Sequence, residues 1–179
     1  YHGTYGRDDI CIAIATGGLK SRKAQQKTQG WGYYATDKRG NTRNEESRRE
    51  YTEFGADLLF FSPSLYGAYS NPKREQMGHF VVGIPEGIAK RNYSIGGSTR
   101  ITSKSDEVVL LDRENPNDGC HIKPEDAYLF IGIEVFEKLK KVGGEEFEEK
   151  VRAIWGDRLI VSNMTPPESI ENLNLPPVN

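Results

Sequence analysis

Three residues of this chain combine types that can do chemistry with flanking sequence that can hold them in place: His2, Tyr34 and Glu107. An imidazole can orient a sugar hydroxyl through its ring nitrogens. A tyrosine ring offers a flat face on which a planar ligand can stack. A carboxylate held at a strand edge can stabilise positive charge that develops in a water-poor cleft. These residue types can bind a flat ring and orient a sugar hydroxyl.

The surroundings of His2 favour close contact with a flat ligand. The chain opens with Tyr1-His2-Gly3-Thr4, and a Gly18-Leu19 turn follows. Gly3 has no Cβ, so a planar group can reach its main-chain N–H and C=O. His2 should lie inside a strand, and one residue is a short lead-in, so we expect further sequence to precede Tyr1.

Of the other two residues, Tyr34 is expected within a short strand and Glu107 at the edge of one. Tyr34 lies in the segment 30–37, where aromatic residues alternate with small ones and leave flat faces exposed. An isolated buried aromatic strand would have the same composition. Glu107 precedes the aliphatic run 108–111, where it can point into a cleft or stand in solvent as the first residue of a strand.

Composition limits the classes of partner. The chain has 179 residues and a formal net charge of -2, which favours neither nucleic acid nor an anionic membrane. No apolar run approaches the ~18 residues that a membrane span needs. Its 2 cysteines and 3 histidines lack the spacing of metal ligands, so we expect no metal site.

The pattern of apolar residues predicts an α+β fold with a split or sandwiched mixed β-sheet and a few flanking helices. Helices are expected at 9–15, capped by Asp8 or Asp9, and at 145–155, where apolar residues recur at helical spacing. Residues 93–104 read as a loop. The expected strands are 58–61, 79–84, 108–111, 127–135 and 159–161.

We expect one domain over residues 1–165, followed by a proline-rich tail over 166–179 that serves as a linker or packs in an extended form. The chain shows no internal repeat. No Gly-x-Gly-x-x-Gly fingerprint follows a strand, so a Rossmann dinucleotide site is not supported.

Several short motifs occur in an order that is typical of one enzyme family. They are Tyr1-His2-Gly3-Thr4, Gly18-Leu19, Thr28-Gln29-Gly30, Gly32-Tyr33-Tyr34-Ala35-Thr36-Asp37 and Glu107-Val108-Val109-Leu110-Leu111-Asp112. This set resembles the H-Y-E class of ADP-ribosyltransferases, which includes the diphtheria-type toxins and the poly(ADP-ribose) polymerases. The resemblance covers residues 1–37 and, more loosely, 105–135. It implies a single catalytic domain of the ADP-ribosyltransferase fold.

The resemblance also implies roles for individual residues. Gly3 would bind the carboxamide of NAD, His2 a ribose hydroxyl, and Thr4 would lie in the same pocket. Tyr34 would stack on one nicotinamide face. Glu107 would bond the 2′-hydroxyl of the nicotinamide ribose, stabilise the oxocarbenium-like charge and polarise the acceptor.

The second stacking residue has two candidates. Tyr51 is the first choice, although its distance from Tyr34 is longer than usual. In an alternative register the segment 60–62 forms the tyrosine strand and Tyr69 is the second stacking residue, which costs the site one tyrosine hydroxyl. The arginine-modifying class of these enzymes carries a Gln or Glu two residues before the catalytic Glu, where this chain has Ser105. We therefore rank that class below the H-Y-E class.

The function implied is transfer of ADP-ribose from NAD, as substrate, to a protein acceptor, by a bacterial toxin or effector that acts in a host cytosol. We expect a monomer with no membrane or nucleic-acid partner. The alternatives are an NAD glycohydrolase, a silent NAD-binding module, a structural domain without an active site, and an RNA 2′-phosphotransferase. The last would need paired arginines in a basic cleft, and the basic pairs available are Arg48-Arg49 and Lys90-Arg91.

Overall fold

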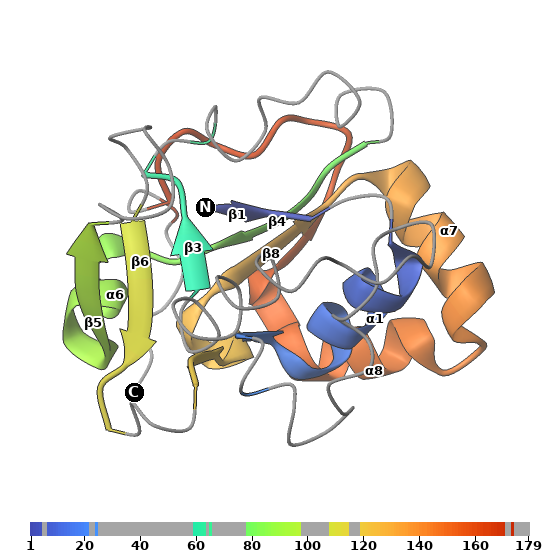
Figure 1. Ribbon diagram of the computed structural model, residues 1–179. Helices are drawn as coiled ribbons and strands as arrows, with labels where there is room; N and C mark the ends of the chain where they lie inside the picture. Colours follow the sequence, from blue (N-terminus) through green and yellow to red (C-terminus); the bar gives the residue numbers. More distant parts are fainter. Residues whose placement is uncertain are drawn as a thin grey trace, which may run out of the picture.

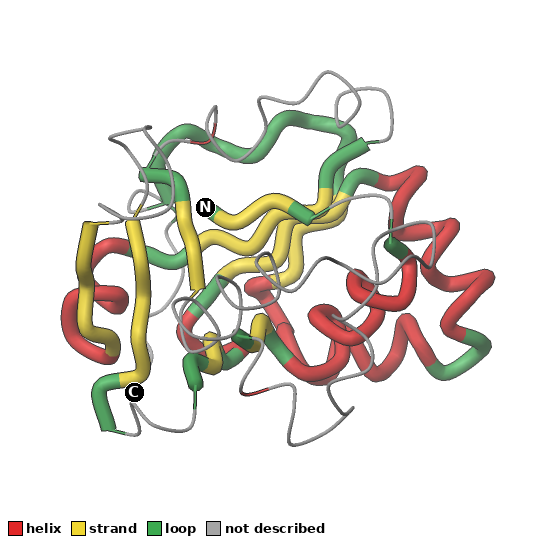
Figure 2. The backbone as a smooth tube through the Cα atoms, in the orientation of Figure 1, coloured by secondary structure: helices red, strands yellow, loops and turns green. Residues whose placement is uncertain are grey.

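The computed structural model describes residues 1–4, 7–21, 24, 59–63, 65, 78–97, 108–114, 119–170 and 173 (Figures 1 and 2). Within these ranges the chain is a mixed α+β protein, as its apolar pattern predicts. The helices are α1 (Asp8–Gly17), α6 (Glu86–Asn92), α7 (Ile133–Gly143) and α8 (Phe147–Trp155). The strands are β1 (His2–Gly3), β2 (Leu19–Lys20), β3 (Leu59–Phe61), β4 (Phe80–Gly83), β5 (Tyr93–Gly97), β6 (Val108–Asp112), β7 (His121–Ile122), β8 (Tyr128–Ile131) and β9 (Leu159–Val161).

The strands form two larger sheets and one short pair. The four-stranded sheet has the order β1-β4-β8-β9, with β9 parallel to β8 and the other neighbours antiparallel. The three-stranded sheet has the order β3-β6-β5 and is antiparallel throughout. Strands β2 and β7 form a separate antiparallel pair. Strand β1 is therefore an edge strand, and β3 is the edge of the neighbouring sheet.

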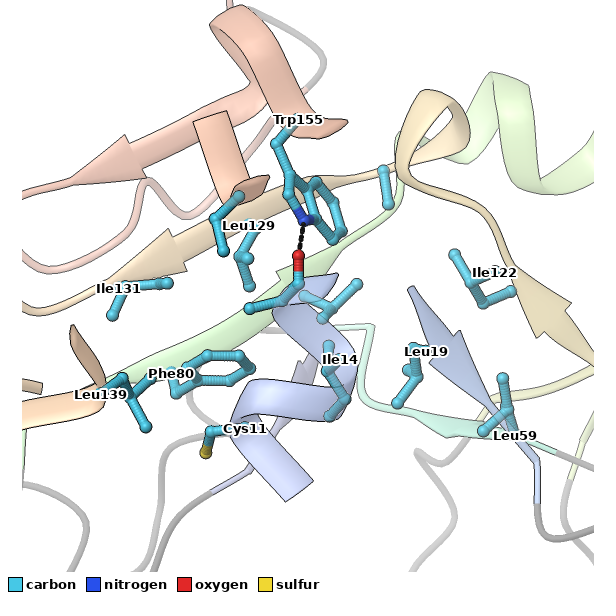
Figure 3. Packing of buried hydrophobic residues seen from close by; sticks show 14 of the residues in the cluster. Cys11, Ile14, Leu19, Leu59, Phe80, Ile122, Leu129, Ile131, Leu139 and Trp155 are labelled. Atoms are coloured by element: carbon cyan, nitrogen blue, oxygen red, sulfur yellow. Dashed lines mark hydrogen bonds between the residues drawn. The ribbon is translucent and has the colours of Figure 1, made fainter. Parts of the chain in front are cut away.

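Alternate side chains of the four-stranded sheet enter two different cores, as the two-residue period of a strand requires. On one face, Val82 and Leu129 pack with buried residues of α1, α7 and α8, and this cluster continues to Leu110 of the three-stranded sheet (Figures 1 and 3). On the other face, Val81 and Phe130 pack with Tyr128, Leu65 and Ile170, which form a second core.

A buried hydrogen bond joins two of the helices in the first core. Trp155 of α8 is 2% exposed, and its indole Nε1 donates to the carbonyl oxygen of Ala15 at 2.7 Å (Figure 3). Ala15 stands in the last turn of α1, where carbonyl groups have no partner within the helix. The indole therefore satisfies an acceptor that would otherwise be buried unpaired.

The predicted helices and most strands are confirmed with small shifts of their ends. Helix α1 is confirmed, but its N-cap is Arg7 and not Asp8 or Asp9, which lie in its first turn. The acids there still face the positive end of the helix dipole. At the other end the helix stops at Gly18, which adopts φ 77°, a backbone conformation that favours glycine.

Two local predictions are wrong. Residues 93–97, expected in a loop, form β5, because hydrogen bonds to β6 outweigh their small, turn-prone side chains. The expected long strand 127–135 ends at Ile131, and α7 begins at Ile133. Both segments are apolar, and a short apolar run does not distinguish a strand from a buried helix. The break falls at Gly132, whose N–H donates to the carbonyl of His79 at 2.8 Å.

An extended segment after β9, residues 162–170, runs back over the second face of the four-stranded sheet; we call it the strap. In Figure 1 it is the red trace that passes above β1. Its start is fixed by the N–H of Ser162, which donates to Ile131 at 3.0 Å. Its far end is fixed by Ile170, which is buried in the second core with Phe130. Residues 166–170 therefore pack against the sheet.

Candidate functional site

The residues of the His-Gly-Thr motif lie on and directly after β1. His2 pairs with Val82 of β4, Gly3 pairs with Val81, and the N–H of Thr4 donates to the carbonyl of Phe80 at 2.9 Å. All three motif residues are half-buried. The side chain of His2 shares the face of its partner Val82, which is the face covered by the helices.

The register of β1 determines where the main-chain groups of Gly3 point. In an antiparallel ladder, residues that bond the partner strand alternate with residues whose N–H and C=O point the other way. Thr4 bonds β4, so Gly3 directs both groups away from β4, toward the open side of this edge strand. No described residue makes a main-chain bond to them there.

The open side of β1 meets the end of β3. The N–H of Ser62 donates to the carbonyl of Tyr1, and the main-chain nitrogen of Tyr1 donates to the carbonyl of Ser62, both at 2.8 Å. A mutual pair of this kind is the antiparallel arrangement, and it would next join Gly3 to Phe60. Gly3 and Phe60 form no such pair among the described residues. The hydrogen bonding between β1 and β3 therefore ends at Tyr1 and Ser62, and the two strands belong to separate sheets beside Gly3.

An aromatic ring from β3 lies beside His2 at this point. The ring centroids of His2 and Phe61 are 5.7 Å apart and the rings are tilted by 56°. Phe61 is 5% exposed and belongs to the first core, so its ring is held in place by packing. The imidazole therefore rests on a rigid apolar wall, while Gly3 next to it offers polar main-chain groups.

Strand β3 also leads to the first residue of β6. Phe61 is the register partner of Val108, which directly follows Glu107 in the sequence. Glu107 itself lies outside the described residues, as do Tyr34, Tyr51 and Tyr69. The structure therefore brings together His2, Gly3 and Thr4 of the predicted site and gives no position for the other four.

Comparisons of the chain with protein-family models, with characterised proteins and with solved structures gave no match. The site must be judged on its own chemistry. The described ranges contain no group of three or more His, Cys, Asp or Glu side chains that could hold a metal ion. In the same ranges, no helix is long and apolar enough to cross a membrane.

The strap carries a carboxylate, Glu168, that the sequence motifs do not single out. The hydroxyl of Tyr1 donates to the carbonyl of Pro167 at 2.6 Å, and Glu168 is the next residue of the strap. Glu168 is exposed, and among the described residues no cation pairs with it. In the sequence, Glu168 is marked only by the rigid Pro166-Pro167 pair directly before it. This pair falls in the expected proline-rich tail, 166–179.

Two other described acids link separate elements of the fold. Asp8 pairs with Lys138 at 2.7 Å, and Asp126 accepts from Tyr93 at 2.7 Å and from Asn92 at 2.8 Å. These contacts fix elements to one another and lie on α1, α6 and the residues before β8. Glu168 differs because its segment is bonded to the residue that precedes His2.

Proposed function

We propose that this protein binds NAD where β1 and β3 part, and transfers ADP-ribose from NAD to a protein acceptor with release of nicotinamide. The observation that carries the proposal is the direction of the Gly3 main chain. Its N–H and C=O point to the open edge, and a carboxamide is a planar group with a matching acceptor and donor. The absence of a Cβ at Gly3 lets that group approach.

The flanking residues support a ligand with both a ring and a sugar. The imidazole of His2 can bond a ribose hydroxyl through either ring nitrogen, according to its tautomer. The ring of Phe61 offers an apolar surface 5.7 Å from the imidazole. The end of β3 lies on the open side of β1, which is why the alternative register with residues 60–62 on the tyrosine strand is kept in the proposal; Tyr69, its second stacking residue, lies outside the described residues.

The chemistry would proceed as follows. The bond between C1′ of the nicotinamide ribose and the ring nitrogen breaks, and nicotinamide leaves as a neutral molecule with the bonding electron pair. Positive charge develops on C1′ and the ring oxygen, where a fixed carboxylate stabilises it. The acceptor nucleophile then bonds C1′ and gives up its proton to a carboxylate or to water.

Two glutamates can supply this carboxylate. Glu107 is the candidate from the sequence motif, and its neighbour Val108 pairs with Phe61 beside His2. Glu168 is the second candidate, because Pro167 before it is bonded to Tyr1; the strap covers the face of the sheet opposite to the His2 side chain, so this carboxylate could reach the site only around the edge of β1. Replacing the true catalyst by glutamine should lower nicotinamide release by about a hundredfold or more, because one preorganised electrostatic group is worth about 3–4 kcal/mol in the transition state.

The test is nicotinamide release from NAD by the wild type, Glu107→Gln and Glu168→Gln, with and without a eukaryotic lysate and labelled NAD. Glu149→Gln, on the exposed surface of α8, is the matched control and should behave as the wild type. Label that appears on protein only with lysate supports transfer, and release without label indicates a glycohydrolase. A folded wild type that neither binds NAD nor releases nicotinamide would refute the proposal.

The RNA-directed alternative receives less support. In the described residues the basic pair Lys90 and Arg91 lies on α6, where Lys90 pairs with Glu86. The guanidinium of Arg113 is engaged with the carbonyls of Arg91 at 3.0 Å and Lys90 at 2.9 Å. Arg113 thus bonds the last carbonyls of α6, and none of these contacts involves β1.

A further inference from the structure

We infer that Tyr1 is a positioning residue, whose side chain couples the strap to the His2 strand and so sets the geometry of the proposed NAD site. The inference rests on the proposed function for its meaning in catalysis. Its structural content stands on the contacts of Tyr1 alone, which reach three separate parts of the fold.

The main chain of Tyr1 determines where β1 lies relative to β3. Its two bonds to Ser62, each 2.8 Å, are the described main-chain link between these two edge strands. Strand β1 has only two residues, so its other fixed points are the pairs with β4. A movement of Tyr1 would therefore pass directly to the main chain of His2 and Gly3.

The side chain of Tyr1 is held on the second face of the sheet. A Cβ at Gly83 would lie 3.3 Å from Cε1 of Tyr1, 3.1 Å from Cδ1 of Ile170 and 3.2 Å from Cε2 of Phe130. The three side chains thus converge on the space that a residue larger than glycine would fill. Glycine at position 83 makes room for the Tyr1 ring and for the end of the strap.

The hydroxyl of Tyr1 completes the connection by donating to Pro167 at 2.6 Å. Between Ser162 and Pro166 the strap is exposed, so its middle is held by this bond and by the burial of Pro166 and Ile170. Because Pro167 precedes Glu168, the same bond also fixes the backbone that bears this carboxylate. One side chain therefore links the strand that carries His2 and Gly3 to the strap on the second face of the sheet.

The first variant is Tyr1→Phe, which removes the bond to Pro167 and keeps the ring. We expect the KM for NAD in nicotinamide release to rise about threefold to tenfold with little change in thermal stability, because one neutral hydrogen bond contributes about 1 kcal/mol. The second variant, Gly83→Ala, displaces the Tyr1 ring by a few tenths of an ångström and should raise KM at least as much. Combined, the two changes should be less than additive.

Met164→Ala is the matched control, since Met164 lies on the strap, is 79% exposed and should leave KM unchanged. A second readout does not depend on NAD: the imidazole titration of His2 by NMR and the amide exchange of Thr4 and Ser62 in the full chain. Faster exchange at both amides and a shifted His2 titration in Tyr1→Phe and Gly83→Ala support the coupling.

The outcomes separate this inference from the proposed function. If the wild type shows no NAD binding or turnover, the proposed function fails, and the exchange and titration still decide whether Tyr1 couples the strap to β1. If both variants lower the melting temperature but leave KM, the His2 titration and both exchange rates as in the wild type, Tyr1 has a structural role only and the inference is overturned.

Discussion

Tyr1 and Ser62 exchange two main-chain hydrogen bonds of 2.8 Å, and the ladder between β1 and β3 goes no further. The pair joins the edge strands of two sheets that otherwise have separate partners. It also leaves the N–H and C=O of Gly3 directed away from β4, beside the aromatic ring of Phe61. A single residue pair therefore both connects the two sheets and creates the edge at which we propose NAD to bind.

Replacing Ser62 by proline should break one of these two bonds, because proline has no N–H to donate to Tyr1, while its carbonyl can still accept from the Tyr1 nitrogen. We expect a loss of about 1–3 kcal/mol in the free energy of unfolding and a large rise in the KM for NAD. Ser62→Ala keeps both main-chain bonds and separates the contribution of the side chain. Denaturant unfolding and nicotinamide release on both variants test the expectation, and equal behaviour of the two variants would contradict it.

Gly18 is required by both conformation and space. Its φ is 77°, and a Cβ there would clash with the carbonyl oxygen of Ile122, so Gly18→Ala should cost more than about 3 kcal/mol. Gly144 has φ 86° but nothing within 4 Å, so Gly144→Ala should cost only about 1–2 kcal/mol. Unfolding by denaturant ranks the two, and a reversed order would contradict the backbone clash.

Trp155→Phe should destabilise the protein by about 2–4 kcal/mol, because it leaves the buried carbonyl of Ala15 without a donor and opens a cavity between α8 and α1. Arg152→Ala removes an exposed pair with Glu148 one turn earlier on the same helix. That control should cost less than about 1 kcal/mol. A similar effect of both changes on denaturant unfolding would show that the indole bond contributes little.

Stability should fall at high pH because of the two buried thiols. Burial raises the pKa of Cys11 and of Cys120 from 9.0 to about 12, with nearby carboxylates adding to the effect. From pH 9 upward the unfolded chain loses these protons and the folded chain retains them. Each thiol therefore removes about 1.4 kcal/mol per pH unit until the folded pKa is reached.

The test is the free energy of unfolding between pH 8 and about 11, measured for the wild type and for Cys120→Ala under reducing conditions. The variant should show a shallower decline, since one of the thiols no longer contributes. Burial also raises the pKa of Tyr93, so part of the decline above pH 10 should persist in the variant. Identical slopes in both proteins would contradict the assignment to Cys120.

Stability should also fall on mild acidification. Burial lowers the pKa of His79 and of His121 below the ordinary 6.5, although the bond from His121 to the carbonyl of Gly17 at 2.8 Å opposes part of the shift. Below pH 6.5 the unfolded chain binds these protons first, so the stability present above that pH is lost as pH falls through the folded pKa. NMR titration of both rings gives the folded values directly, and a pKa at or above 6.5 would refute the expectation.

Much of the local structure was predictable from the sequence, because apolar spacing and glycine stops act over a few residues. The helix α8 and the strand β6 follow from their own residue patterns. Strand β5 did not, since its pairing with β6 depends on a partner and not on its composition. The switch from β8 to α7 at Gly132 depends in the same way on its contact with His79.

The sequence by itself determined that His2 and Gly3 are neighbours. The imidazole therefore lies next to a residue without a Cβ, whose main-chain N–H and C=O a ligand can approach. The tertiary structure alone decided that Phe61 faces this imidazole, that Gly3 points to an open edge, and that Glu168 follows a residue bonded to Tyr1. The reason is physical. Residue type fixes what a group can bind, whereas register and packing between distant segments fix which groups meet.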